Sequence, residues 1–286
     1  MDKWFYPKGA LAHNEWECKV DSTIPGWTYT GLRIATVANE QKLRIEADKI
    51  ERVIFILEGA SLEVSFTHNA TTSVELLAGR QSVFRGTVDH LYLPIDTEIT
   101  ISGNARFAIG EAPATQTFPV KIIKAQDVPV FIRGAGKDSR EVHNFGMPDV
   151  LAADRLIVVE VIVPAGNSSG TPSHKHDTYL PGIESNLEEI YYFESKEAIF
   201  RGYSSDQREF DLTQTVGNGD VVLVPFGWHG PVSAKSGHDL YFFNVMAGPD
   251  PVREWNVTEH PDEVLTRQSW RTQLPDPRLP YLPDKK

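Results

Sequence analysis

The stretch Val221-Val222-Leu223-Val224-Pro225-Phe226-Gly227-Trp228-His229 joins four apolar residues to a turn that contains proline and glycine, and it ends in a histidine. A short apolar run between turn residues is typical of a buried β-strand. Many short strands and little helical periodicity predict an all-β sandwich or barrel. Comparable apolar or alternating runs, separated by Gly, Pro, Asn or Asp, cover residues 52–57, 62–66, 91–93, 99–101, 106–109, 120–123, 156–163, 189–193, 198–203 and 240–245.

The strand pattern occurs twice along the chain. Glu51-Arg52-Val53-Ile54-Phe55-Ile56 resembles Glu188-Glu189-Ile190-Tyr191-Tyr192-Phe193, and Leu91-Tyr92-Leu93-Pro94 resembles Val222-Leu223-Val224-Pro225. The similar order and spacing predict two copies of one β-barrel. We expect the copies in residues 1–130 and 131–255, followed by a C-terminal arm in residues 256–286. Repeated prolines after residue 274 exclude a helix or a central strand there, so we expect an extended arm that packs on the body or on another subunit.

Composition restricts the class of partner. The 286 residues carry 28 Lys and Arg against 39 Asp and Glu, a net charge of −11. This balance opposes extended contact with nucleic acid or with an anionic membrane surface, and it leaves a small molecule as the expected partner. The single cysteine, Cys18, cannot form an internal disulfide or a cysteine-rich zinc site. Because we find no signal peptide and no apolar stretch of membrane-spanning length, we expect a cytoplasmic protein, and the sequence leaves a homo-oligomer open.

The second copy carries a pattern of histidines that suits a metal ion. His174 and His176 stand two residues apart, so on a strand both imidazoles face the same side. His229 follows a later strand, and Glu189 opens the strand between them. Three histidines and one carboxylate suit one borderline divalent metal, namely Zn, Mn, Fe, Ni or Co. The plainer interpretation is that His229 caps a loop and that Glu189 ends a strand in solvent.

Two adjacent carboxylates compete for the fourth ligand position. We choose Glu189 because it directly precedes the aromatic strand that continues to Phe193. If Glu189 faces the barrel interior, Tyr191 and Phe193 share that face and Glu188 points away. The first copy offers no such set, because Arg52 stands where Glu189 stands, Glu98 stands where His229 stands, and no H-x-H precedes Arg52. We therefore expect a first barrel without metal.

These motifs resemble those of the cupin superfamily, whose jelly-roll barrels hold a metal with three His and one Glu. Within it, the chain resembles the 5-deoxy-glucuronate isomerase family of myo-inositol catabolism, a bicupin with two jelly-roll β-barrels in one chain. The resemblance spans essentially the whole chain and is sharpest between residues 133 and 256. The matching segments are 136–144, 172–177, 187–192, 224–231 and 239–249.

The resemblance implies a reaction and its cofactor. It implies conversion of 5-deoxy-D-glucuronate to 2-deoxy-5-keto-D-gluconate, an aldose–ketose isomerisation through a cis-enediolate. One divalent metal would act as Lewis acid on the C1 and C2 oxygens. No redox change occurs, so we expect no nucleotide cofactor, and the sequence has no Rossmann glycine motif. The substrate is a small anionic sugar acid, so a cationic group must lie beside the metal.

The sequence offers several candidates for the residues that transfer the proton and bind the substrate carboxylate. Tyr191 is a candidate for proton transfer, although a barrel-core aromatic is the plainer interpretation and a tyrosine base needs activation. Glu160 interrupts an apolar strand, which suggests either an acid/base group or a solvent-facing side chain. The candidates for binding the substrate carboxylate, each also interpretable as an ordinary surface residue, are Lys175, Arg155 and Arg201.

Two other functions fit the same ligand set. A bicupin dioxygenase would use these ligands with iron, and a sugar-binding or storage bicupin would use the barrel without catalysis. Twelve residues, 177–188, separate His176 from Glu189, whereas general cupins have a much shorter gap. The long gap resembles the inositol-pathway isomerases and disfavours the dioxygenase. Storage forms are secretory, and this chain has no signal peptide.

Overall fold

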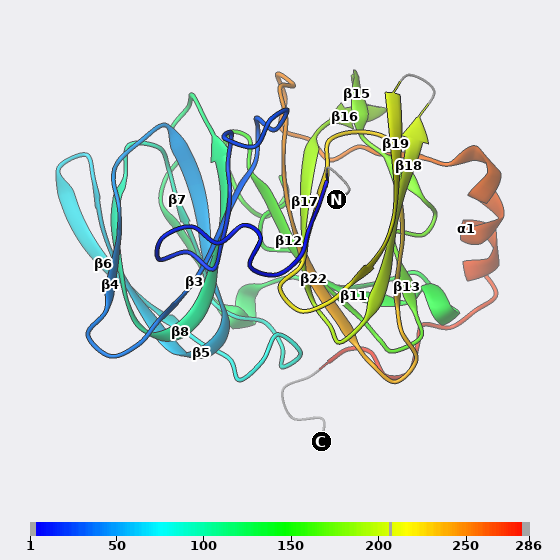
Figure 1. Ribbon diagram of the computed structural model, residues 1–286, viewed down its shortest axis with the longest axis horizontal. Coiled ribbons are helices and arrows are strands. Elements are labelled where there is room, and N and C mark those ends of the chain that lie inside the picture. Colours follow the sequence, from blue (N-terminus) through cyan, green and yellow to red (C-terminus); the bar gives the residue numbers. More distant parts are fainter. Residues whose placement is uncertain (1–3, 206–207, 282–286) are drawn as a thin grey trace.

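The computed structural model describes residues 4–205 and 208–281, and it consists almost entirely of antiparallel strands. Figure 1 shows two β-barrels side by side, the first in blue to cyan and the second in green to orange. Two jelly-roll barrels in one chain form the bicupin fold, so the predicted fold class is confirmed.

The first barrel is one sheet in the order β2-β3-β8-β5-β7-β9, with β4 paired to β8 and β6 paired to β5. Two long strands, β5 and β8, run through the whole barrel and pair with each other along most of their length. The strands are β2 (Cys18–Val20), β3 (Gly31–Val37), β4 (Lys42–Ile45), β5 (Ile50–His68), β6 (Thr71–Ala78), β7 (His90–Leu93), β8 (Glu98–Pro113) and β9 (Lys121–Ile123).

The second barrel is built from two larger sheets. The first has the order β1-β20-β17-β22-β12-β11-β10, and the second has the order β19-β18-β21-β14-β23 with β13 paired to β21. Their strands are β1 (Phe5–Tyr6), β10 (Val130–Arg133), β11 (Arg140–His143), β12 (Ile157–Val163), β13 (Ser168–Ser169), β14 (His174–Lys175), β17 (Glu188–Glu194), β18 (Ala198–Ser205), β19 (Arg208–Val216), β20 (Val221–Val224), β21 (Trp228–Ala234), β22 (Leu240–Ala247) and β23 (Thr258–Glu259).

One strand crosses between the two halves of the sequence. We expected residues 1–130 to stay together, but β1 pairs with β20 through Phe5↔Val222 and Tyr6↔Val221. Without β1, β20 would be the open edge of its sheet, with unpaired N–H and C=O groups. The N-terminal residues therefore belong structurally to the second barrel.

The two barrels repeat the same register at the positions that the sequence aligns. In the first barrel Arg52 pairs with Leu93, and in the second Glu189 pairs with Val224. Each partner directly precedes a proline, Pro94 or Pro225. The metal-ligand position of the second barrel and the arginine of the first are therefore structural equivalents.

The sheet between the barrels is buried on both faces. Along β17, Ile190 and Tyr192 pack into the core of the first barrel, whereas Tyr191 and Phe193 pack into the core of the second. This alternation is the strand period of two. It turns Glu189 toward the interior of the second barrel, as the sequence pattern predicted.

A reciprocal pair of carboxylates fastens the barrels together. Glu51, at the start of β5, accepts backbone N–H groups of residues 154–156 in the second half, at 2.6–2.9 Å. Glu188, at the matching start of β17, accepts the N–H groups of Thr28 and Tyr29 in the first half, at 2.6–3.1 Å. Glu188 thus points away from its own barrel and caps a loop of the other.

The C-terminal arm lies against the second barrel. It contains β23, the 3-10 turn η3 (Pro261–Glu263) and the helix α1 (Val264–Trp270), which Figure 1 places on the outer side of that barrel. Beyond α1 the chain is extended and bonded to the body, since Leu274 C=O accepts from Gly136 N–H and Asp276 N–H donates to Ser139 Oγ. Residues 282–286, including Pro283, lie outside the described part.

Two short strands and two 3-10 turns lie outside the main sheets. The inserted segment before Glu189 forms a hairpin of β15 (Asp177–Leu180) and β16 (Glu184–Asn186), and two 3-10 turns, η1 (Ala125–Asp127) and η2 (Gly136–Asp138), flank β10. Among the described residues, the helices are all too short or too polar to cross a bilayer.

Candidate metal centre

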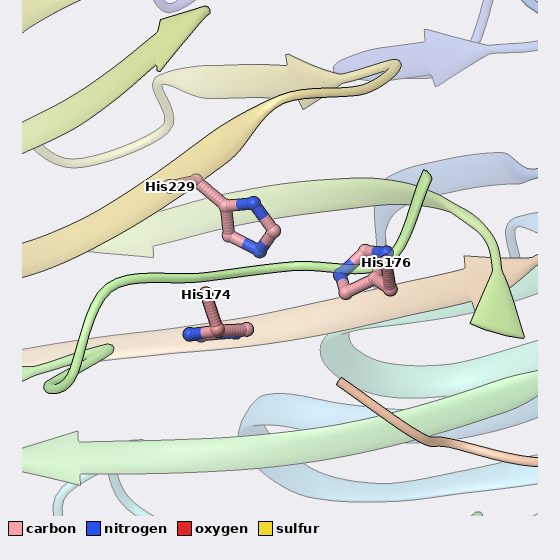
Figure 2. A group of neighbouring side chains, drawn as sticks. All are labelled: His174, His176 and His229. Carbon is pink, nitrogen blue, oxygen red and sulfur yellow. The ribbon is translucent and has the colours of Figure 1, made fainter. Parts of the chain in front are cut away.

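Two neighbouring segments bring the three predicted histidines together. His174 lies on β14 and is the direct cross-strand partner of His229 on β21, and His176 follows between β14 and β15. Gly230 permits this pairing, because its φ of +97° suits glycine and a Cβ would lie 2.1 Å from the carbonyl oxygen of Gly170. Figure 2 shows the three imidazole rings converging from these segments.

The rings are close enough to share one ion. Their ligand nitrogens all lie within 4.8 Å of one another, and the ring of His229 lies 4.5 Å from that of His174 and 4.8 Å from that of His176. His176 and His229 are buried and His174 is half-buried. A compact, largely dry group of imidazoles is the arrangement that transition metals bind.

Backbone carbonyls select the tautomer of each ring. The Nδ1 atoms of His174, His176 and His229 face the carbonyl oxygens of Pro172, Leu187 and Gly227 at 3.3, 3.1 and 3.2 Å. In the neutral ring, the proton therefore lies on Nδ1, and the Nε2 lone pair is directed into the cluster. This is the outer-shell pattern that orients metal-ligating histidines.

Glu189 completes the set from the strand β17. Its Oε2 atom lies 3.0 Å from Nε2 of both His176 and His229. Burial alone would raise the pKa of Glu189, but the two imidazoles lower it well below the usual range, so the carboxylate is ionised. Burial and the neighbouring rings lower the pKa of His174 well below its usual value, which keeps that ring neutral.

The residues present fit a divalent metal. His229 Nε2 is buried and makes no hydrogen bond within the described part of the chain, although Glu189 Oε2 is close. A buried nitrogen without a partner is costly unless a cation binds it. Three Nε2 atoms and one carboxylate also match the ligand types of zinc, manganese, iron, nickel and cobalt. The prediction of these four ligands agrees with their placement.

A cavity opens beside this cluster. With its mouth it encloses about 610 Å³, and His174, Glu189 and Tyr191 form part of its wall. The remaining wall is largely apolar, from Val142, Val159 and Phe242.

Tyr191 is placed where the sequence expected it. It is buried and lines the cavity together with Glu189 and Asn244. Burial and the Glu189 carboxylate raise the pKa of Tyr191 well above its usual value. The structure therefore presents a neutral phenol, which donates a proton, and offers no activation as a base.

Glu160 does not reach this site. It is fully buried but lies on the opposite face of β12 from Val159 and Val161, which line the cavity. Its carboxylate pairs with Arg80 of the first barrel and accepts hydrogen bonds from Tyr241 and His143. The sequence reasoning offered a catalytic group or a solvent-facing one, and the structure instead shows an ion pair that joins the barrels.

The three cations proposed for the substrate carboxylate also lie outside the cavity. Lys175 points away from the histidines and binds Asp177 and Glu184 at 2.9 and 2.6 Å, as strand alternation requires. Arg155 donates to the carbonyl oxygens of Gly248 and Asp250. Arg201 is exposed on β18 and stacks on Tyr203.

Two arginines that the sequence reasoning overlooked do line the cavity, Arg133 on β10 and Arg140 on β11. The signal was present, because Arg140, Val142 and Asn144 alternate along one strand face and all three line the cavity. Glu141 and His143, between them, bond to each other on the other face at 2.7 Å.

The first barrel fills the equivalent place with an ion pair. Arg52, the counterpart of Glu189, is fully buried and binds Glu111 and Asp48, each at 2.7 Å. A guanidinium with two carboxylate partners satisfies its charge without an ion. The first barrel without metal stays a prediction, and the Arg52 ion pairs occupy the position that Glu189 has in the second barrel.

The two adjacent carboxylates provide a direct test of the ligand choice. We expect Glu189→Gln to lose the metal, because an amide oxygen is a weaker ligand than a carboxylate. Glu188→Gln should retain the metal and instead lower stability by about 1–3 kcal/mol, since Glu188 caps amides of the other barrel. Elemental analysis and urea unfolding measure the two effects. Metal loss in Glu188→Gln but not in Glu189→Gln would reverse the assignment.

Comparisons with known proteins agree with this architecture. The KduI/IolB family profile matches residues 4–264. The chain is 39% identical over 254 residues to the 5-deoxy-glucuronate isomerase of Geobacillus kaustophilus, which covers 85% of this chain and 88% of the relative. The crystal structure of an IolB-like protein from Salmonella typhimurium LT2 superposes with a TM-score of 0.83 at 32% identity, over 92% of this chain and 99% of that one.

A more distant structure shares the fold alone. An oxalate decarboxylase from Lactobacillus farciminis superposes with a TM-score of 0.65 at 11% identity, over 90% of this chain and 88% of that one. The family profile and the curated relative together cover most of this sequence, and on that evidence the chain belongs to the KduI/IolB family.

Proposed function

We propose that this chain is a metal-dependent aldose–ketose isomerase that converts 5-deoxy-D-glucuronate to 2-deoxy-5-keto-D-gluconate in myo-inositol degradation. Its curated relatives are named 5-deoxy-glucuronate isomerase, which makes the chain an enzyme of the isomerase class. The observation that carries the proposal is the convergence of three histidine rings and the Glu189 carboxylate beside a cavity whose wall includes His174 and Glu189.

His174, His176, Glu189 and His229 would hold the metal. A divalent ion bound there would supply Lewis-acid polarisation of the carbonyl and hydroxyl oxygens of an α-hydroxyaldehyde. The chain's own contribution to the ion is orientation, because the three Nδ1–H groups are held by backbone carbonyls.

The reaction moves one proton from C2 to C1 through a cis-enediolate, and Tyr191 is the side chain best placed to take part. Its phenol lies in the cavity wall between Glu189 and Asn244, within the part of the site that holds the reacting carbons in this proposal. Because its pKa is raised, the phenol acts as a hydrogen-bond donor to the developing enediolate oxygen, and the C2 proton passes to a separate base before it reaches C1. The buried Asn244 amide, which also donates to Ile190 C=O at 3.4 Å, fixes the orientation of the phenol.

The apolar wall protects this chemistry from water. Val142, Val159 and Phe242 line the cavity beside Tyr191. Exclusion of water strengthens the electrostatic contacts within the site and slows loss of the mobile proton to solvent. A deoxy sugar, which carries a methylene in place of one hydroxyl group, suits such a wall.

Metal removal tests the proposal directly. The purified protein is expected to hold about one divalent ion per chain and to isomerise 5-deoxy-glucuronate. Dialysis against a chelator should abolish turnover, and one of Zn, Mn, Fe, Ni or Co should restore it. Elemental analysis and NMR detection of the ketose provide the measurements. Oxygen uptake without isomerisation would favour a dioxygenase, and sugar binding without turnover would favour a non-enzymatic bicupin.

A further inference from the structure

The two arginines of the cavity, half-buried Arg140 and exposed Arg133, differ from three arginines that pair with carboxylates elsewhere in the protein. Arg52 and Arg106 pair with Glu111 and Glu194 at 2.7 and 2.6 Å, and Arg80 pairs with Glu160. In contrast, neither Arg133 nor Arg140 forms an ion pair with a carboxylate anywhere in residues 4–205 and 208–281. The single hydrogen bond of the Arg140 guanidinium goes to the carbonyl oxygen of Asp138 at 3.1 Å.

Aromatic side chains hold these two guanidinium groups in place. Arg133 lies over the ring of Trp255 at 5.2 Å, and Arg140 lies over the ring of Trp270 at 5.7 Å. Trp270 in turn donates to Asp138 Oδ2 at 2.9 Å, which occupies that neighbouring carboxylate. Stacking fixes the plane of a guanidinium but leaves its N–H edge free for an anion.

The cavity has a surplus of positive charge at this end. Among the residues that line it, Glu189 is the one carboxylate, and it belongs to the metal-ligand set. Burial and the neighbouring charge of Arg133 lower the pKa of Arg140 to about 10, with a further contribution from Arg267. Arg140 stays protonated at neutral pH, and a bound anion would offset its repulsion from Arg133.

A neutral donor is also free. The indole Nε1–H of Trp255, a residue of the cavity wall, is buried and makes no hydrogen bond within the described residues. A buried donor without a partner is costly, and a bound ligand oxygen would satisfy it. Two guanidinium groups without a carboxylate partner and one indole N–H without an acceptor therefore line the same cavity, within the part of the chain that the structure describes.

We propose that Arg140 and Arg133, with the Trp255 indole N–H, form the subsite that binds the carboxylate of a six-carbon sugar acid whose other end lies at the His–Glu cluster. This inference rests on the proposed function, because it assigns the two ends of that substrate. His174 and Glu189 line the same cavity as Arg140, Arg133 and Trp255. The C-terminal arm then has a role in the site, since Trp270 of α1 braces Arg140.

A pair of unreactive probes tests the subsite without turnover. L-Gulonate is glucuronate with its aldehyde reduced, and D-glucitol differs from it by a CH2OH group in place of the carboxylate. By calorimetry on the metal-loaded protein, we expect Arg140→Gln to weaken L-gulonate binding by about 10- to 100-fold, as for loss of a charged hydrogen bond. D-Glucitol binding should stay unchanged. Arg133→Gln should act in the same direction, and Arg140→Lys should retain part of the affinity because it keeps the charge without the bidentate edge.

The matched control is Arg271→Gln, an exposed arginine of the same C-terminal arm, which should alter neither probe. Metal content, measured in every variant, should stay at the wild-type level. Unchanged L-gulonate affinity in both Arg140→Gln and Arg133→Gln would overturn the subsite, and so would equal weakening of both probes. Arg-dependent L-gulonate binding in a wild type that fails to isomerise 5-deoxy-glucuronate would support the subsite while rejecting the proposed function.

Discussion

Replacement of His229 by alanine is expected to remove the bound metal and the isomerase activity together. His229 is fully buried, its Nε2 has no other partner among the described residues, and it faces both other rings and Glu189. Loss of Lewis-acid catalysis corresponds to several kcal/mol of transition-state stabilisation, so kcat should fall by about 1,000-fold or more. His174→Ala and His176→Ala should behave alike, since all three rings supply Nε2 to one point.

The measurement is metal content by elemental analysis beside kcat on 5-deoxy-glucuronate. His13→Ala is the matched control, because His13 is exposed and lies in the first half of the chain. It should retain both metal and activity. Full activity in His229→Ala preparations that contain no metal would show that the reaction does not depend on this centre.

Replacement of Glu160 by glutamine is expected to produce the largest loss of stability. Its partner Arg80 is almost fully buried and comes from the first barrel, so the change leaves a guanidinium charge buried without a counter-ion. Breaking a buried ion pair by removing one partner costs about 3–5 kcal/mol. The free energy of unfolding in urea should fall by that amount, because the amide keeps only one of the two acceptor oxygens that Arg80, Tyr241 and His143 share.

An exposed ion pair provides the comparison. Lys235 and Glu197 lie 2.5 Å apart with both side chains about half exposed, and Lys235→Gln should change stability by less than about 1 kcal/mol. Folded Glu160→Gln should keep its metal, because the carboxylate faces away from the cavity. A collapse of kcat in stable, metal-loaded Glu160→Gln would restore the catalytic role that the structure does not support.

The alternation of residues along strands predicted the fold class, the alignment of the two barrels and the orientation of Glu189. Short apolar runs between turn residues identified the all-β class, and the paired motifs around Arg52 and Glu189 aligned two barrels in the register that the structure shows. The same period separated Glu189 from Glu188, because neighbours on a strand face opposite sides of the sheet. It failed at β1, since only the three-dimensional arrangement brings an N-terminal segment to the open edge of β20.

The predicted catalytic and substrate-binding residues that the structure places outside the cavity are charged groups. Glu160, Arg155 and Lys175 looked equally available in the sequence, yet each is occupied by a partner distant in the chain or on another strand. Arg140 looked ordinary, and the fold leaves it beside the cavity without a carboxylate. Whether a charged side chain is paired or available to a ligand depends on tertiary contacts, and no local sequence pattern encodes those contacts.

The sequence by itself determined which residues can form strands and which donors a metal would prefer, because both follow from local alternation and side-chain chemistry. It therefore sufficed for the bicupin fold, and it selected His174, His176, Glu189 and His229 as candidate ligands, which the structure brings together. Only the tertiary structure decided the partners of each charge, since an acidic chain of net charge −11 can still enclose an unpaired pair of arginines. The cation that an anionic substrate would require thus depends on packing, and the two arginines that line the cavity are Arg140 and Arg133.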